Sequence, residues 1–374
     1  MYALARAAVQ RPPNLVNSLL RSLAVFCLLF VVLPRSALAT ASGQRAPRDR
    51  YGDPLPSGAI ARLGTIRWRV DSNLNAFACW YVDEKRLGTV DFFGNFRLFD
   101  LPTGAISSRV PTVATRDATY SAVAVAADGR SFALAGEDGV AHIIDATHRR
   151  ELKRWHAHAR PIQAMALSRD GRRLVTRSID DTLGIWDVPS SRELCRISAP
   201  AAAPGNRTRH CFNSIDISPD GKLVAWIGFD PDLSIHLCDA ASGRETARLQ
   251  GLEHTIQRVA FSPDGRLLAS TGNRSRARLW DTNTGTLLRQ LGDEDGSDTA
   301  YAVFSPDGRR FATAGYNAPV RIMDVETGKE LCRIPHHPQC DHEIAFAPDS
   351  RTLVILRGQL DPPSTATTRS PARR

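Results

Sequence analysis

The sequence predicts an all-β protein built from seven repeated units, because two short markers recur along it in phase. The first marker is the tetrapeptide SPDG, found at residues 218–221, 262–265 and 305–308 and in degenerate form elsewhere. A fixed period of about 20 to 50 residues indicates a repeat architecture. The aspartates of this marker are spaced by 42 to 50 residues and give seven units: Asp83, Asp128, Asp170, Asp220, Asp264, Asp307 and Asp349.

The second marker is an apolar residue followed by aspartate, and it agrees with the phase of the first. It occurs six times rather than seven: Phe99-Asp100, Ile144-Asp145, Trp186-Asp187, Cys238-Asp239, Trp280-Asp281 and Met323-Asp324. Between the markers lie short phrases rich in valine, leucine and aromatic residues with glycine or aspartate punctuation, which is typical of strand, turn and strand. Pro-Asp-Gly suits a tight turn because it combines a fixed φ, a side-chain acceptor and a residue that tolerates positive φ.

One unit in particular carries a family resemblance. Residues 256–281 read IQRVAFSPDGRLLASTGNRSRARLWD, which resembles a WD-repeat unit with four strands per blade. The resemblance covers roughly residues 59 to 357. It implies an all-β, seven-bladed WD-repeat β-propeller, similar to exported WD-repeat proteins of bacteria.

The seventh blade is expected to be incomplete and to be closed by an N-terminal strand. Residues 61–69, ARLGTIRWR, resemble an outer strand, and residues 342–350 and 351–358 supply two inner strands. A third strand is missing from the sequence, because residues 361–374 are proline-rich and polar. Three explanations remain open: a three-stranded blade, a strand of unrecognisable sequence, or a truncated chain.

The N-terminus has the pattern of an export signal. Residues 1–39 contain four arginines and no acidic residue, the apolar run LAVFCLLFVVL at 23–33, and the small-x-small sequence Ala37-Leu38-Ala39. We expect a signal peptide over 1–39, a linker over 40–58, the propeller over 59–360 and a disordered tail over 361–374. The protein is then periplasmic or extracellular, with a membrane anchor as the alternative if the leader is not cleaved after Ala39.

Charge argues against a nucleic-acid partner. The formal net charge of +9 falls to +5 without the leader arginines, and much of the remaining excess lies in the linker and the tail. A nucleic-acid binder concentrates basic charge on the folded body. We therefore expect a protein or peptide partner, no nucleic acid, and a membrane contact only through an uncleaved N-terminal segment.

Six cysteines remain after residue 39, an even number that permits disulfides in an exported protein. The pairs Cys195 with Cys211 and Cys332 with Cys340 are the candidate bridges, because both separations are short and begin in the same phrase of the repeat. The alternative is that the cysteines are buried free thiols that pack as small hydrophobic side chains.

One segment gathers metal-ligand side chains, namely His336, His337, Cys340 and His342. The alternative is structural, because His337 falls where the repeat places its Gly-His histidine. No GxSxG or GxGxxG motif and no triad in a recognisable context is present, so we expect no catalytic residues, no cofactor and no enzyme.

The WD-repeat resemblance implies two further sets of residues. In the third unit His158, Ser178, Asp180 and Trp186 match the hydrogen-bonded set of the family. Residues just before the turn aspartate point to one face of the ring in the family, and here they are Phe92, Glu137, Ile179, Pro231, Asn273 and Tyr316.

Two functions follow from these expectations. The first is a scaffold outside the cytoplasm that presents the loops of a rigid ring to a protein partner, although fold alone does not identify that partner. The second is an exported propeller enzyme of the hydrolase, lactonase or quinone-dependent dehydrogenase type. That second function needs carboxylates, histidines or a metal to converge at the mouth of the central channel.

Overall fold

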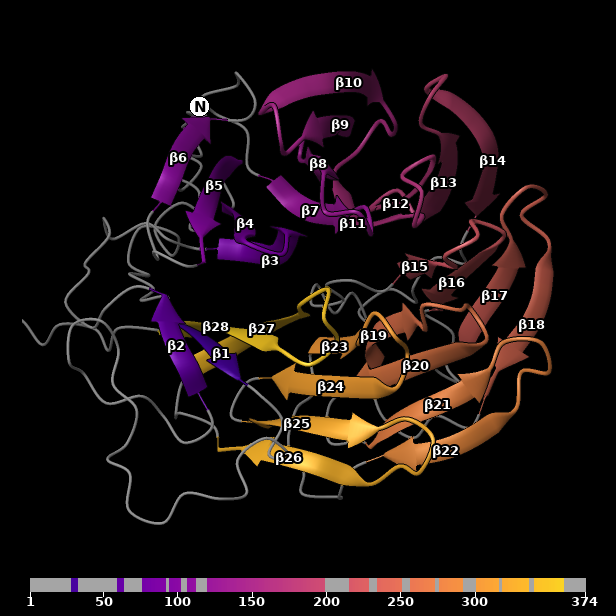
Figure 1. Cartoon of the computed structure of the whole chain (residues 1–374). Helices are drawn as coiled ribbons and strands as arrows, with labels where there is room; N and C mark the ends of the chain where they lie inside the picture. The colour runs from indigo at the N-terminus through magenta and orange to yellow at the C-terminus, as the bar shows by residue number, and fades with distance from the viewer. Residues whose placement is uncertain are drawn as a thin grey trace, which may run out of the picture.

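Seven four-stranded antiparallel sheets lie around a central axis, in the arrangement of a β-propeller (Figure 1). The predicted all-β propeller is therefore confirmed, and the part of the chain that is described contains strands and turns only. The computed structural model describes residues 28–32, 59–63, 76–91, 94–101, 106–111, 120–198, 215–228, 234–250, 256–272, 276–291, 301–315, 318–335 and 340–359.

Six sheets are continuous in sequence, and their strands are called a to d from the centre of the ring outward. The first three sheets are β3 (Ala76–Asp83), β4 (Arg86–Asp91), β5 (Asn95–Asp100) and β6 (Ile106–Pro111); β7 (Tyr120–Val125), β8 (Ser131–Gly136), β9 (Val140–Asp145) and β10 (Arg150–His156); and β11 (Ile162–Leu167), β12 (Arg173–Ser178), β13 (Thr182–Asp187) and β14 (Arg192–Ser198).

The next three sheets repeat this order. They are β15 (Ile215–Ile217), β16 (Leu223–Ile227), β17 (Ile235–Asp239) and β18 (Glu245–Leu249); β19 (Ile256–Phe261), β20 (Leu267–Gly272), β21 (Ala277–Asp281) and β22 (Leu287–Leu291); and β23 (Tyr301–Phe304), β24 (Arg310–Gly315), β25 (Ala318–Asp324) and β26 (Glu330–Ile334).

The repeated aspartates make the a to b turns. All seven accept a hydrogen bond from the backbone N–H two residues later, at 2.8 to 3.1 Å. The glycine that follows needs positive φ: at Gly129 φ is 67°, and an added Cβ would lie 2.0 Å from the Tyr81 carbonyl oxygen of the neighbouring sheet. The turn function predicted from the repeat is thus what the structure shows.

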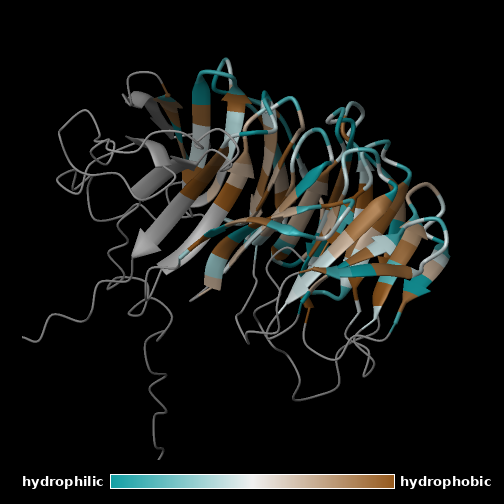
Figure 2. Cartoon of the chain, turned by 60° about the horizontal axis from the view of Figure 1, so that its bottom comes forward, coloured by the Kyte–Doolittle hydropathy of each residue, from teal (hydrophilic) through white to brown (hydrophobic). Residues whose placement is uncertain are grey.

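The hydrophobic core lies between adjacent sheets rather than within one of them. Apolar clusters join the first sheet to the second, and so on around the ring as far as the sixth and seventh. In the first of these clusters Trp80 packs against Phe96 and Phe132, with centroid separations of 5.6 and 4.9 Å. In Figure 2 the brown, hydrophobic segments lie mainly on the strands, and many of the turns are teal.

The seventh sheet corrects a prediction, because it has four strands. Its order is β2 (Ala59–Leu63), β1 (Leu28–Val32), β28 (Leu353–Gln359) and β27 (Cys340–Phe346), and Figure 1 shows the indigo pair β1 and β2 beside the yellow pair β27 and β28. The two C-terminal strands are present. Of the expected outer strand at 61–69, residues 61–63 belong to β2, and residues 64–69 lie outside the described residues. The strand that seemed to be missing, strand c, comes from the apolar run near the N-terminus, because every residue of β1 pairs with β28.

The ring closes between the ends of the chain. Strand β27 contacts β3 of the first sheet on one side and β23 and β24 of the sixth sheet on the other. No helix long and apolar enough to cross a membrane occurs among the described residues.

The predicted disulfides stay predictions, because each pair contains one cysteine whose side chain is not described. Cys195 and Cys332 both pack against apolar clusters between sheets. Burial raises the pKa of Cys195. Their proposed partners, Cys211 and the side chain of Cys340, lie outside the described residues. This packing is what the alternative expects, in which the cysteines act as small hydrophobic side chains.

Candidate functional site

A buried polar network in the third sheet links strands b and c to the segment that precedes strand a. The side chain of His158 has no exposed surface, and its Nε2 lies 2.8 Å from Thr176 Oγ1. Trp186 donates its indole N–H to the same hydroxyl at 2.9 Å, and Thr176 donates to the Gly184 carbonyl at 3.3 Å. One hydroxyl on β12 therefore joins three parts of the blade.

The predicted set for this network contained one wrong residue. The hydroxyl between His158 and Trp186 belongs to Thr176 and not to Ser178. Ser178 instead donates to the Arg160 carbonyl and accepts from the Asp180 N–H, both at 3.2 Å. The two hydroxyls lie two residues apart on one strand and therefore on the same face of the sheet. Only the cross-strand register, which places Thr176 opposite Gly184, shows which hydroxyl reaches Trp186.

Asp180 and Arg196 complete the surroundings of the imidazole. Asp180 Oδ2 lies 3.3 Å from His158 Nδ1, and Arg196 directs a guanidinium N–H to the same nitrogen at 3.1 Å. Burial lowers the pKa of His158, with Asp180 opposing and Arg196 reinforcing that effect. A neutral imidazole protonated on Nε2 satisfies the contacts with Thr176 and Arg196, so this histidine is a structural group.

The fourth sheet has a different arrangement, in which the tryptophan lies on strand b and the small residue lies on strand c. Cys238 stands where the third sheet has Trp186, and Trp226 stands where it has Thr176. Trp226 donates to Cys238 Sγ at 3.4 Å and stacks on His236 with centroids 4.0 Å apart. The absence of the Trp-Asp tryptophan is visible in the sequence, whereas its replacement lies on the neighbouring strand β16 and follows only from the strand pairing.

The predicted binding face is only partly described. Glu137 is exposed and Ile179 is half-buried, each in the turn between strands b and c of its sheet. Phe92, Pro231, Asn273 and Tyr316 lie outside the described residues, as do the candidate metal ligands His336 and His337. Cys340 and His342 are placed on β27 by their backbone alone, opposite Gln359 and Arg357.

A surface pocket of about 490 Å³ lies between the first and second sheets. It is formed by both a to b turns and by the c to d turn of the second sheet, so it opens on the face opposite to the predicted one. The residues that line it are Val82, Asp83, Arg86, Arg130, Ser131, Asp145, Thr147, His148 and Leu152. The repeat markers predict the individual turns but not the pocket, because its walls come from turns of two different repeats.

The ionisable groups of this pocket are largely paired within their own turns. Asp83 binds Arg86 at 2.6 Å, and Asp145 binds His148 Nδ1 at 2.8 Å. Burial would raise the pKa of each carboxyl, but hydrogen bonds from the following turn residues outweigh it and lower both pKa values. The pocket is therefore a polar notch with paired charges and the half-exposed Leu152 at its edge.

One carboxyl on the inner strands behaves differently. Asp216 on β15 accepts the backbone N–H of Phe261 on β19 at 2.7 Å and that of Ile217 at 2.8 Å. Burial raises the pKa of Asp216 to about 6, against the lowering effect of these bonds and of Arg258.

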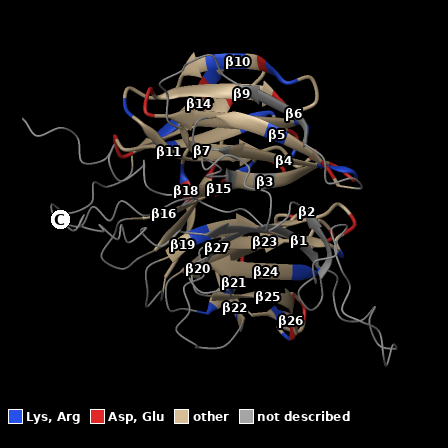
Figure 3. Cartoon of the chain, turned by 90° about the vertical axis from the view of Figure 1, so that its left-hand side faces the viewer, with Lys and Arg blue, Asp and Glu red and all other residues tan. Residues whose placement is uncertain are grey.

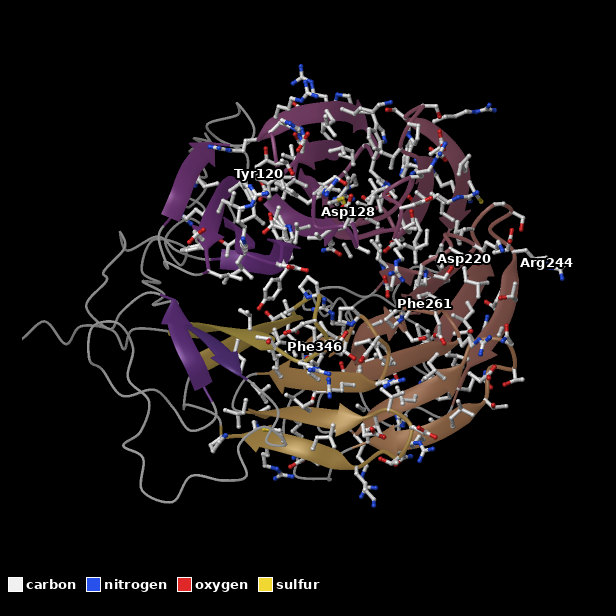
Figure 4. The ribbon with its side chains drawn as sticks, viewed as in Figure 1. Tyr120, Asp128, Asp220, Arg244, Phe261 and Phe346 are labelled. Carbon is white, nitrogen blue, oxygen red and sulfur yellow. The ribbon has the colours of Figure 1, made fainter. Side chains whose placement is uncertain are left out.

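Figure 4 places Phe261 and Phe346 toward the middle of the ring and Arg244 at its outer rim.

Asp216 therefore ties two neighbouring inner strands together. Arg258 lies over the Tyr301 ring at 5.7 Å, which extends this polar group to the sixth sheet. Across the described ranges, no group of three or more His, Cys, Asp or Glu side chains is placed to hold a metal ion.

Comparison with known proteins shows WD40 repeats in this chain. Residues 149–187 and 243–281 match the family model "WD domain, G-beta repeat". The chain is 25% identical over 156 residues to the U3 small nucleolar RNA-associated protein 15 homolog of Xenopus laevis, which is 41% of this chain and 28% of that protein. It is 29% identical over 132 residues to human Transducin beta-like protein 2, which is 34% of this chain and 28% of that protein.

A bacterial relative and a solved structure add to this picture. An uncharacterized WD repeat-containing protein of Synechocystis is 28% identical over 140 residues, 37% of each chain. The matches thus span well under half the length of these relatives. The β-propeller domain of Cps50 (Swd1) from Myceliophteria thermophila superposes with a TM-score of 0.59 at 12% identity, covering 75% of this chain and 96% of that one.

Proposed function

We propose that this protein is a non-enzymatic WD-repeat scaffold that binds a protein or peptide partner through the turns of its ring. One observation carries the proposal: buried side chains such as those around Thr176 hold the blade strands in place, while the turns between them remain at the surface. WD-repeat propellers typically bind proteins, and the WD40 repeats found here support the same role. Seven sheets serving as seven blades offer several such turns at once.

The partner class follows from the surface charge. Figure 3 shows basic and acidic residues of both signs mainly at the turns and strand ends, and several cations are paired, such as Arg333 with Glu330 at 2.7 Å. A nucleic-acid surface would need an uncompensated basic stripe. The proposal accordingly names a protein partner and no nucleic acid, and it places the protein outside the cytoplasm on the N-terminal pattern alone.

The experiment compares the two faces of the ring. The full chain is cross-linked to its partner, and the double variant Glu137→Arg with Ile179→Asp on the predicted face is set against Arg130→Glu on the pocket face. We expect the partner to be lost with the double variant and kept with Arg130→Glu. Equal loss of the partner with both variants would contradict the proposed face. The absence of any stoichiometric partner would contradict the scaffold function.

The enzyme alternative has its own measurement. Elemental analysis of the full chain purified without chelators reports bound metal directly. A stoichiometric metal that is lost with His336→Ala but kept with His148→Ala would overturn the scaffold and direct attention to His336, His337, Cys340 and His342.

A further inference from the structure

The apolar run at residues 23–33 has two incompatible uses. By composition it is the hydrophobic part of an export signal, followed by the small-x-small sequence that ends at Ala39. In the fold, Leu28–Val32 of the same run is β1, the third strand of the seventh sheet. One molecule cannot place these residues in a bilayer and in the ring at the same time.

The backbone of β1 is paired along both of its edges. All five residues pair antiparallel with β28, from Leu28 opposite Arg357 to Val32 opposite Leu353. On the other edge, β1 pairs with β2 from Leu29 opposite Leu63 to Val32 opposite Ala59. This is the position of an interior strand, in which backbone groups on both sides are satisfied.

Removal of residues 1–39 would dismantle half of this sheet. Strand β2 has β1 as its sole partner among the described strands, so it would lose its place in the ring. Strand β28 would become an open edge, although Leu353, Val354 and Ile355 are fully buried when β1 is present. An unprotected, apolar edge strand is a template for aggregation, which folded proteins avoid.

We propose that the folded protein keeps its apolar N-terminal segment as the third strand of the seventh sheet, where it is withheld from membranes and from cleavage after Ala39. Closure then uses two strands from each end of the chain, and folding and export compete for one segment. This inference goes beyond the scaffold function, which depends on the turns of other blades. It limits the export part of that proposal to chains that have not yet folded.

The first test measures the register of β1 in the full chain. The pair Val31→Cys with Val354→Cys places cysteines at directly opposite positions, where a disulfide can form. The matched control is Val31→Cys with Ile355→Cys, because residue 355 is equally buried but points to the other face of the sheet. Both variants carry Cys27→Ser, and bonds are mapped by mass spectrometry of tryptic peptides.

The second test separates pairing from hydrophobicity. Phe30→Pro lies within β1 and Phe26→Pro lies within the same apolar run but before the strand. Both substitutions interrupt the run alike, but Phe30→Pro removes a ladder hydrogen bond of β1, whereas residue 26 is not part of that strand. We expect a lowered unfolding temperature with Phe30→Pro and an unchanged one with Phe26→Pro. Flotation with phosphatidylethanolamine and phosphatidylglycerol vesicles should leave the folded wild-type chain unbound.

The outcomes are distinct. Selective cross-linking at Val31 and Val354, an intact N-terminus by mass and no flotation establish the closing strand. Equal or absent cross-linking of the two pairs, or a folded protein that begins at residue 40 with unchanged stability, would overturn it. Neither result bears on partner binding, so a failed scaffold function would be recognised separately by the face variants.

Discussion

The third and seventh sheets have the same four-strand order, but they are built in different ways. In the third sheet four successive strands join through tight turns, and the Thr176 hydroxyl links them to His158 and Trp186. The seventh sheet joins β1 and β2 to β27 and β28, across nearly the whole chain. Local contacts form at little entropic cost, whereas bringing distant ends together costs more.

This difference predicts where the ring is weakest. In repeat proteins stability is approximately a sum of each unit and its contacts with its neighbours. The third sheet is one continuous stretch of chain and shares apolar clusters with the second and fourth sheets. The seventh sheet must first bring the two ends of the chain together before it can contact the sixth and first sheets. The ring is therefore expected to open first at the seventh sheet.

The largest expected effect comes from a substitution that removes the buried tryptophan of the third sheet. Trp186→Ala deletes a buried indole that packs between the second and third sheets and donates to Thr176. Substitutions of this kind cost about 3–5 kcal/mol. Urea unfolding of the full chain should show a loss of this size, and a loss below about 1 kcal/mol would mean that the third sheet is not the more stable one.

A smaller effect depends on pH and reports a contact between sheets. Because the pKa of Asp216 rises from 3.8 to about 6 on folding, its contribution to stability is full below about pH 4 and is lost as the pH rises through 6. A shift of this size corresponds to about 2–3 kcal/mol.

The variant Asp216→Asn does not titrate and provides the reference. The wild type should lose stability between pH 4.5 and pH 7.5, whereas the variant should not. The unfolding free energy of the variant minus that of the wild type should therefore increase over this range. A lost hydrogen bond lowers the stability of the variant by the same amount at every pH and does not change this trend. A difference that stays flat over this range would show that the carboxyl is not confined between β15 and β19.

The next effect distinguishes the roles of the Thr176 and Ser178 hydroxyls, which the sequence alone could not tell apart. Thr176→Val keeps the volume but leaves the Trp186 and His158 ring nitrogens without their partner, at a cost of about 1–3 kcal/mol. Ser178→Ala removes only bonds to the backbone and is the matched control. Equal losses from the two substitutions, measured by thermal unfolding, would restore the original assignment of Ser178.

The smallest effect is an expected absence of change. If Cys195 and Cys332 act as small hydrophobic side chains between the sheets, a reducing agent should leave the unfolding temperature unchanged. A native disulfide would contribute about 2–5 kcal/mol, and its reduction would lower that temperature clearly.

Much of the fold was predictable because its signals are local. Each SPDG turn and each apolar-Asp turn specifies a hairpin within a few residues, so six sheets follow from their own sequence. Strand β1 was not predictable, because it lacks the Trp-Asp marker and its partner β28 lies more than three hundred residues away. Its apolar composition also fits an export signal equally well.

The candidate site divides in the same way. His158, Asp180 and Trp186 follow from the repeat, but the choice of Thr176 over Ser178 depends on cross-strand register. The exchange of Trp226 and Cys238 and the pocket between the first and second sheets arise from contacts between different strands or repeats. A pattern read along one repeat contains no information on such contacts.

Amide hydrogen exchange on the intact full-length protein tests the central claim most directly. If β1 closes the ring, the amides of Leu353 to Arg357 on β28 have partners on both sides and should be protected, though less strongly than those of Arg173 to Ser178 on β12. If they exchange as fast as an unstructured segment, the seventh sheet is open and the closing strand is contradicted.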